Sequence, residues 1–270
     1  MKTFVILGGG YGGITLIHRL LEHGVPDDVR LVLVDRMPYQ GLKTEYYALA
    51  AGTVSEAEIR VKFPEDPRLV VKYGEVAGVD LERKQVSLIN DEALPYDWLA
   101  IALGCVDRFH GIPGADKYAH TVQTMSAARE TYRAINDLRP YSQVTIVGGG
   151  LSGIEIAAEL RESRPDLNIR ILDRGKTILS AYPEKLIEYV REWFVEHQVE
   201  MRSHVSIARV EPGAVYNGDE EIATDVTVWT AGIQPSPVVQ KLDLPKDAQG
   251  RVLLNEYHQI PTYRDVFVIG

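Results

Sequence analysis

Hydrophobic and polar positions recur in one order at two places along the chain. In the first, an apolar run leads directly into glycines in the segment VILGGGYGG at 5–13. Apolar residues at helical spacing then predict a helix over 14–23, and residues 31–34 predict a second buried strand. That strand ends at Asp35, so the pattern indicates a strand, a tight turn, a helix and a parallel strand.

The second copy begins about 140 residues later and repeats every part. The segment TIVGGGLSG at 145–153 is followed by a predicted helix over 154–161 and a predicted strand over 169–172, which ends at Asp173. A single glycine-rich turn beside a surface acid would be weak evidence. Because strand, glycines, helix, strand and acid recur together, the sequence indicates a duplicated unit.

Both glycine segments have the spacing G-x-G-x-x-G. The glycines are Gly8, Gly10 and Gly13 in the first copy and Gly148, Gly150 and Gly153 in the second. The first glycine allows a tight turn, the second lets a pyrophosphate approach the backbone, and the third lets the helix pack closely on the sheet. Free N–H groups at the helix start then attract the anion. The terminal acids follow the third glycines by 22 and 20 residues, which suits a carboxylate that binds ribose.

The segments between these motifs predict two small meanders and the remaining strands and helices. We expect antiparallel meanders from 69–73, 76–80 and 85–89, and from 205–210 and 216–223. We expect further strands at 98–103, 226–230 and 265–269, and helices at 126–138 and 185–197. The fold class is therefore α/β, with two Rossmann-like dinucleotide-binding domains that each contain a parallel sheet and an antiparallel meander.

The proline- and glycine-containing segment 110–114 places a boundary after the first domain. We expect residues 1–110 to begin the first domain, residues 111–233 to form the second, and residues 234–270 to return to the first.

Composition narrows the function without naming it. The chain has 270 residues, 45% of them hydrophobic and 25% charged, as in ordinary globular proteins. Its net charge of −9 disfavours nucleic acid as a partner. Cys105 is the only cysteine, which excludes a disulfide or paired-thiol redox centre within one chain. The seven histidines are scattered, so no metal site is expected.

With these motifs in place, the chain resembles the type II NADH dehydrogenases, which are NADH:quinone oxidoreductases. They belong to the flavoproteins that carry two dinucleotide-binding domains. The resemblance extends over essentially the whole sequence. It is carried by VILGGGYGG, by LVLVDR ending at Arg36, by YYALAAGTV at 46–54, by YDWLAIALG at 96–104, by TIVGGGLSGIEIAAEL at 145–160 and by VWTAGIQP at 228–235.

The resemblance implies that the first glycine segment binds FAD. The implied FAD-binding residues are Gly8, Gly10, Tyr11, Gly12, Gly13, Asp35, Arg36, Lys43, Thr44, Val76, Ala102 and Gly104. Asp35 would bind the ribose and Val76 the adenine through its backbone. Arg36 either packs along the adenine or extends into water, and Lys43 and Thr44 either reach the flavin or lie in a solvated loop.

The second segment is implied to bind NADH. Its residues are Gly148, Gly150, Ser152, Gly153, Asp173 and Gly232. The candidate catalytic residue is Glu155, which is placed in the first helical turn and directed toward the nicotinamide and the flavin edge. The alternative is that Glu155 only interacts with the helix dipole. Asp173 should repel the 2′-phosphate of NADPH, although Arg174 beside it could offset part of that repulsion.

The implied reaction passes a hydride from NADH to the flavin and electrons onward to an external acceptor. One cysteine cannot form an internal disulfide, which leaves a diffusible quinone or another external oxidant, and the resemblance implies the quinone. The alternatives are a ferredoxin- or rubredoxin-type reductase and a non-catalytic NADH-binding redox sensor. The substrates would be NADH and a small acceptor, and the resemblance also admits a homodimer.

In the family the last strand continues into a Gly-Asp pair and a helix, whereas this sequence stops at Gly270. We therefore expect a C-terminally truncated chain with FAD binding weakened or lost. The resemblance places the full-length protein in the cytoplasm. There it would lie peripherally at the inner face of the cell membrane, attached through a C-terminal region.

Overall fold

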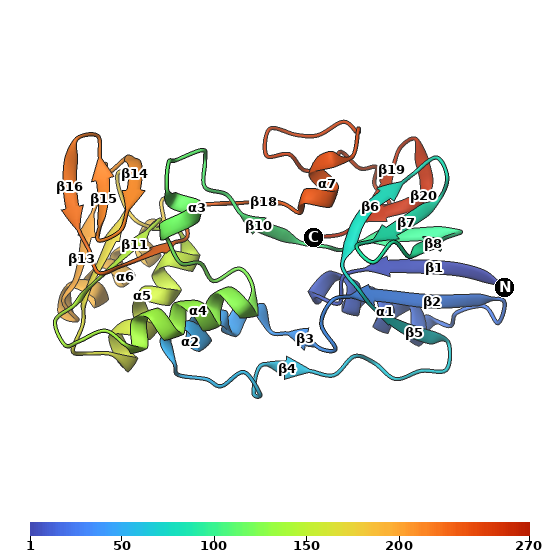
Figure 1. Ribbon diagram of the computed structural model, residues 1–270, viewed down its shortest axis with the longest axis horizontal. Coiled ribbons are helices and arrows are strands. Elements are labelled where there is room, and N and C mark those ends of the chain that lie inside the picture. The colour runs from blue at the N-terminus through green and yellow to red at the C-terminus, as the bar shows by residue number, and fades with distance from the viewer. The chain divides into compact units, whose positions relative to one another are not determined.

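The computed structural model describes all 270 residues, and their contacts divide the chain into two compact units. Unit 1 contains Met1–Gly41, Arg60–Val106 and Gln234–Gly270, and unit 2 contains Leu42–Ile59 and Asp107–Ile233. Each unit contains a parallel sheet and an antiparallel meander (Figure 1). The fold is therefore α/β with two Rossmann-like units. The nucleotide-binding domain boundaries given above remain predictions, and the structure adds that residues 42–59 belong to unit 2.

Unit 1 is organised around a six-stranded sheet with the strand order β19-β20-β9-β1-β2-β5. All neighbouring strands are parallel except β19 and β20. The strands are β1 (Lys2–Leu7), β2 (Val29–Asp35), β5 (Leu69–Tyr73), β9 (Trp98–Ile101), β19 (Gln259–Ile260) and β20 (Tyr263–Val268). Helix α1 (Tyr11–His23) connects β1 to β2 and ends at Gly24, whose φ of 90° favours glycine.

The second half of β1, from Phe4 to Leu7, is continuously apolar because both faces of the sheet are covered there. Ile6 packs in one buried cluster with Ile14 and Ile17 of α1. Val5 and Leu7 face a second cluster that includes residues of the meander. That meander consists of β6 (Val76–Asp80), β7 (Gln85–Leu88) and β8 (Ala93–Pro95).

One predicted meander strand was wrong. Residues 69–73 form β5, which pairs in parallel with β2 at the edge of the main sheet. Leu69 and Val71 pack against the cluster that contains α1, and the N–H of Gly74 donates to the carbonyl of Asp35 at 2.9 Å. A short apolar run predicts a strand but not the strand with which it pairs. The pairing depends on contacts with residues that are distant in sequence.

The remaining small elements lie, along the sequence, near the points where the chain passes from one unit to the other. Strands β3 (Gln40–Gly41) and β4 (Arg60–Val61) pair antiparallel on either side of residues 42–59. Strands β10 (Cys105–Asp107) and β18 (Ile233–Pro235) also pair with each other. Helix α7 (Pro237–Lys241) begins with proline, which suits a first helical residue.

Unit 2 repeats the plan with a parallel sheet in the order β13-β12-β11-β17. Its strands are β11 (Gln143–Val147), β12 (Asn168–Leu172), β13 (Val199–Arg202) and β17 (Val226–Trp229). Its meander consists of β14 (Ile207–Glu211), β15 (Ala214–Asn217) and β16 (Glu220–Ala223). The helical elements are η1 (Lys43–Glu45), α2 (Tyr46–Ala51), α3 (Ala115–Tyr118), α4 (Met125–Asn136), α5 (Leu151–Ser163) and α6 (Glu184–Glu196).

The meander of unit 2 covers one face of its sheet. Trp229, Val147 and Leu172 of the sheet are buried together with Val215 and Ile222 of the meander. The indole nitrogen of Trp229 donates to the carbonyl of Arg108 at 3.0 Å, so its one polar atom is satisfied inside the core.

Helices α2, α4 and α5 pack together within unit 2. Helix α4 begins at Thr124, whose side chain accepts the N–H of Ala127 at 3.1 Å, as expected for an N-cap. Helix α2 ends at Gly52, which has a φ of 80° and lies against the ring of Tyr132 from α4.

The longest helices, α1, α5 and α6, have 13 residues each. A bilayer-spanning helix needs about 20 residues. None of the helices combines the length and the apolar character needed to cross a membrane.

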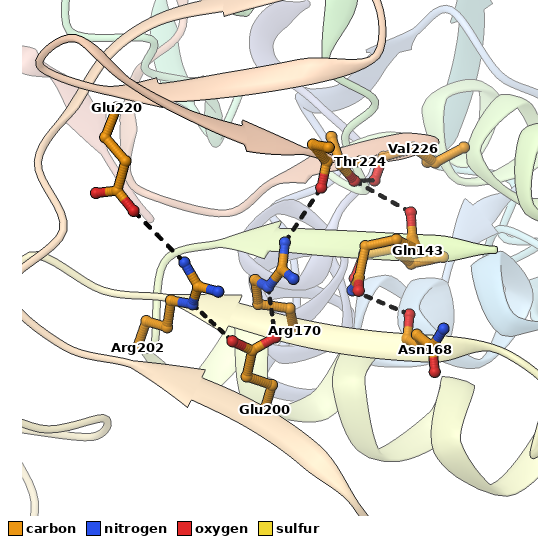
Figure 2. A network of polar contacts seen from close by, with 10 residues as sticks. Gln143, Asn168, Arg170, Glu200, Arg202, Glu220, Thr224 and Val226 are labelled. Atoms are coloured by element: carbon orange, nitrogen blue, oxygen red, sulfur yellow. Dashed lines mark hydrogen bonds and ion pairs between the residues drawn. The ribbon is translucent and has the colours of Figure 1, made fainter. Parts of the chain in front are cut away.

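A network of charged side chains joins the sheet of unit 2 to the end of its meander (Figure 2). Arg170 is 13% exposed and contacts Glu200 at 2.6 Å, and it also donates to the carbonyl of Ala223 at 3.2 Å. Arg202 contacts the other carboxylate oxygen of Glu200, also at 2.6 Å. Burial raises the pKa of Glu200, but hydrogen bonds from both arginines outweigh burial, and its pKa is lowered overall.

We predict that Arg170→Met lowers the free energy of unfolding by about 1.5–3 kcal/mol at neutral pH, because it removes charge-assisted hydrogen bonds. Because the pKa of Glu200 is lower in the folded protein than in the unfolded chain, this carboxylate stabilises the fold at pH values above its pKa in the unfolded chain. The contribution is lost as the pH falls through the pKa of Glu200 in the folded protein. The acid-side loss of stability below pH 4.5 should therefore be smaller in the variant. Urea denaturation at several pH values measures both effects.

Arg19→Met is the matched control, because the Arg19–Glu22 pair is exposed and should contribute under about 1 kcal/mol. An equal loss of stability in both variants, or an unchanged acid profile in Arg170→Met, would contradict the prediction.

Candidate functional site: two glycine turns

The two glycine turns have the same backbone geometry. Gly8 has a φ of 99° and Gly148 a φ of 112°. A residue with a side chain would be strained in this backbone conformation. A Cβ atom on Gly13 would overlap the carbonyl oxygen of Gly8, and one on Gly153 would overlap that of Gly148. The first and third glycines are thus required sterically, because each helix begins directly against its own turn.

The middle glycines have a different environment. A Cβ on Gly10 or Gly150 would have no atom within 4 Å, so the space beside each is open. Each is also the N-cap of its helix, α1 or α5, and neither helix has a side-chain cap. The open cradle and the uncapped N–H groups fit a pyrophosphate at both turns.

Each turn is bonded to the acid at the end of the following strand. Asp35 accepts the N–H of Gly9 at 2.6 Å, and Asp173 accepts the N–H of Gly149 at 2.7 Å. The second oxygen of each carboxylate accepts a backbone N–H two residues on, from Met37 in unit 1 and from Gly175 in unit 2. The structure therefore brings both predicted ribose-binding acids to the rim of their glycine turns.

Packing around the first turn involves three residues besides the glycines. The carbonyl oxygen of Ala102 lies 2.5 Å from the Cβ position of Gly8, so Ala102 adjoins the turn. Phe63 lies against Gly9, and Ile269 lies 3.0 Å from the Cβ position of Gly12. The sequence analysis missed Phe63 and Ile269. Position 63 carries no motif. Residue 269 could have been found because it directly follows β20, and its N–H donates to the carbonyl of Ile101.

The other residues predicted for the first turn are more dispersed. Tyr11 is the exposed first residue of α1, and Arg36 and Gly104 are also exposed. Val76 is half-buried at the start of β6. Lys43 and Thr44 lie in η1 of unit 2, so the structure does not group them with the first turn. Their assignment to a flavin stays a prediction.

The second turn has polar neighbours. The hydroxyl of Thr230 lies 2.9 Å from the Cβ position of Gly148 and donates to the carbonyl of Val147 at 3.0 Å. Ser152 is the second residue of α5, and its hydroxyl lies 2.9 Å from that of Tyr47. Thr230 and Tyr47 were missed from the sequence. Thr230 could have been found because it directly follows β17.

Gly232 lies just after β17, with a φ of 143°. His110 Nε2 contacts the carbonyl of Ala231 at 2.8 Å and lies 2.8 Å from the Cβ position of Gly232. The N–H of Arg108 donates to the carbonyl of Gly232 at 3.0 Å. These contacts hold the turn that follows β17 and place His110, which had no role assigned from the sequence, beside it.

Glu155 is the fifth residue of α5, which begins at Leu151, so it lies in the second turn rather than the first. Burial raises the pKa of Glu155, and the charges of Glu159 and Glu45 raise it further. Its protonated form is therefore favoured relative to an ordinary glutamate, opposite to what a helix N-terminus alone would do.

Asp107 is a second carboxyl group of unit 2 with a raised pKa, and the sequence gave no signal for it. Burial raises the pKa of Asp107, and a hydrogen bond from Thr121 and the charge of Lys43 offset part of that effect. Lys43 therefore interacts electrostatically with a half-buried acid at the end of β10.

Cys105 is half-buried and forms no disulfide. No three side chains of histidine, cysteine, aspartate or glutamate are grouped so that they could bind a metal ion.

Comparison with known proteins gives a consistent picture. Residues 2–270 match the family model described as pyridine nucleotide-disulphide oxidoreductase. The NADH dehydrogenase-like protein YutJ of Bacillus subtilis is 52% identical over 270 residues, which is 100% of this chain and 76% of that protein. A type II NADH:quinone oxidoreductase of Staphylococcus haemolyticus is 24% identical, over 100% of this chain and 74% of its own. The chain thus spans about three quarters of the length of these relatives.

The fold is also found among solved structures. NDH2 from Plasmodium falciparum in complex with NADH superposes with a TM-score of 0.80 at 19% sequence identity. The alignment covers 100% of this chain and 64% of that one. At this identity the similarity concerns the fold.

We predict that Gly153→Ala lowers the stability of unit 2 by at least about 2 kcal/mol, because the added methyl group overlaps a backbone carbonyl that cannot move freely. Gly150→Ala should change stability by less than about 1 kcal/mol, since its Cβ position is open and only the N-cap preference changes. Thermal or urea denaturation of the two variants provides the measurement. Equal stabilities would show that the helix does not pack on the turn in this way.

Proposed function

The chain belongs to the pyridine nucleotide-disulphide oxidoreductase family, and we propose that it is an FAD-dependent NADH dehydrogenase whose electron acceptor is a quinone. The observation that carries the proposal is the duplicated turn. Each copy combines an open middle glycine, an uncapped helix start and a carboxylate bonded to the turn. Two such sites in one chain suit two dinucleotides.

In this proposal unit 1 binds FAD and unit 2 binds NADH. The N–H groups at the start of α1 and α5 hold the two pyrophosphates, and Asp35 and Asp173 accept hydrogen bonds from the ribose hydroxyls. The bound cofactors supply hydride transfer and electron storage. The chain itself supplies binding, orientation and the electrostatic environment.

Glu155 is the proposed catalytic residue on the NADH side. Its raised pKa, caused first by burial and then by Glu159 and Glu45, brings its titration closer to neutral pH. A carboxyl group of this kind can donate a hydrogen bond in its protonated form and accept one when ionised.

The quinone acceptor is inferred from two observations. One cysteine cannot provide the paired thiols of a disulfide centre. The Staphylococcus haemolyticus relative is named as a quinone oxidoreductase. Since many quinones partition into lipid, we extend the proposal to a peripheral position at the cytoplasmic face of the membrane. A homodimer stays a prediction.

The deciding experiment mixes the protein, supplied with excess FAD, with NADH in the absence of oxygen. We expect rapid loss of the flavin absorbance near about 450 nm and its return when a quinone is added. Glu155→Gln should keep both nucleotides bound and slow the bleaching by about tenfold to a hundredfold, because its side chain no longer titrates. Stopped-flow absorbance measures the rates.

Gly10→Ala and Gly150→Ala are the paired controls for this experiment. The first should weaken flavin binding, and the second should keep the flavin but weaken NADH binding, because each added methyl group occupies one open cradle. Binding of both nucleotides without bleaching would favour the non-catalytic sensor. An unchanged rate in Glu155→Gln would remove that residue from the mechanism.

We predict that NADH is preferred over NADPH by at least about tenfold in kcat/KM. Two charges about 4 Å apart near a surface repel by roughly 4 kcal/mol, so Asp173 opposes a 2′-phosphate even if Arg174 recovers part of the loss. Asp173→Asn should lower the ratio of kcat/KM for NADH to kcat/KM for NADPH, while Asp35→Asn should leave this ratio unchanged. Steady-state kinetics with both nucleotides test this, and equal use by the native protein would contradict it.

A further inference from the structure

Residues 42–59 are attached by two side-chain hydrogen bonds to one side of α5, one from Tyr47 in α2 and one from Thr53, which follows it. Residues 42–59 belong to unit 2, and α2 packs against α5. The hydroxyl groups of Tyr47 and Ser152 are 2.9 Å apart. The hydroxyl of Thr53 donates to the carboxylate of Glu159 at 2.7 Å. Ser152 and Glu159 are separated by seven residues, or two helical turns, so both bonds lie on the same side of α5.

The same segment also acts on Glu155, which lies on α5. Glu155 is three residues after Ser152, a spacing that puts it on the same side of α5. Glu45, the residue that precedes α2, is one of the charges that raise the Glu155 pKa. Segment 42–59 therefore covers the part of α5 that contains Ser152 and the candidate catalytic residue.

The Tyr47–Ser152 pair has a direction that matters for anion binding. Ser152 is the second residue of α5 and follows the open cradle at Gly150. In a bond between two hydroxyl groups, one donates and the other accepts. A phenol is more acidic than an alkyl alcohol and is the better donor. When Tyr47 donates, the hydrogen of Ser152 is free to donate to a phosphate oxygen at the start of the helix.

We propose that Tyr47 is a positioning residue for the nicotinamide nucleotide, acting through the hydroxyl group of Ser152. Tyr47 fixes the side chain of Ser152 and directs its hydrogen toward the pyrophosphate bound at α5. The inference rests on the proposed function, since it requires that unit 2 binds NADH. It adds a residue from outside both glycine motifs to the nucleotide site.

The test compares Tyr47→Phe, Ser152→Ala and the double variant by isothermal titration calorimetry with NADH and with ADP-ribose, which keeps the pyrophosphate. We expect each single variant to bind both ligands about three- to tenfold more weakly, as for the loss of one hydrogen bond. The double variant should bind each ligand no more weakly than the single variant that has the lower affinity. The reason is that both changes disable the same donor to the phosphate, the hydroxyl group of Ser152.

Two controls separate positioning from loosening of α2. Tyr132→Phe makes the same chemical change on α4, where the ring contacts Gly52. Thr53→Val removes the other side-chain bond between segment 42–59 and α5. Both should bind NADH with native affinity. In flavin reduction, Tyr47→Phe should raise the KM for NADH and keep the limiting rate within about twofold of native.

The inference is overturned if Tyr47→Phe binds both ligands like the native protein. It is also overturned if the losses of Tyr47→Phe and Ser152→Ala multiply in the double variant, or if Thr53→Val reproduces the loss. If the native protein binds neither NADH nor ADP-ribose, the proposed function fails with it. That result is distinct, because it appears before any variant is compared.

Discussion

The close approach of each helix to its own glycine turn is the constraint on which both units depend. Gly13 and Gly153 have no side chain, and a Cβ atom at either position would overlap the carbonyl of the first glycine of its turn. This contact places the uncapped starts of α1 and α5 at the carboxyl edge of their sheets, where ligands bind in open α/β folds. It also leaves the space beside Gly10 and Gly150 open. A pyrophosphate therefore meets backbone N–H groups rather than side chains.

The two turns share this geometry but have different neighbours. The first is packed by the apolar residues Phe63 and Ile269, whereas the second has the hydroxyl groups of Thr230 and of the Tyr47–Ser152 pair. Both keep a carboxylate bonded to the turn, so each acid is held in a fixed position. Such preorganisation lowers the entropy lost on binding. The duplicated backbone thus gives two turns of similar geometry, and the surrounding side chains make them chemically distinct.

Residues 42–59 show how a short segment changes the properties of a site. The segment lies in sequence between two parts of unit 1 but packs on α5 and α4 in unit 2. Glu45 of this segment is one of the charges that act on Glu155. Burial and the charges of Glu159 and Glu45 raise its pKa, and the hydrogen bond from Thr53 holds Glu159 in place. The electrostatic environment of the candidate catalytic residue is therefore a product of packing.

The sequence by itself determined the two glycine turns, the helices and strands that flank them, the acids at the strand ends and the α/β class. These features are local, because they depend on periodicity, on glycine at fixed spacing and on residues near one another in the chain. Only the tertiary structure decided that residues 69–73 join the main sheet, that residues 42–59 join unit 2, and that Tyr47 meets Ser152. Each of these contacts joins residues that are distant in sequence. An apolar run or a single tyrosine does not by itself indicate which residue it will contact.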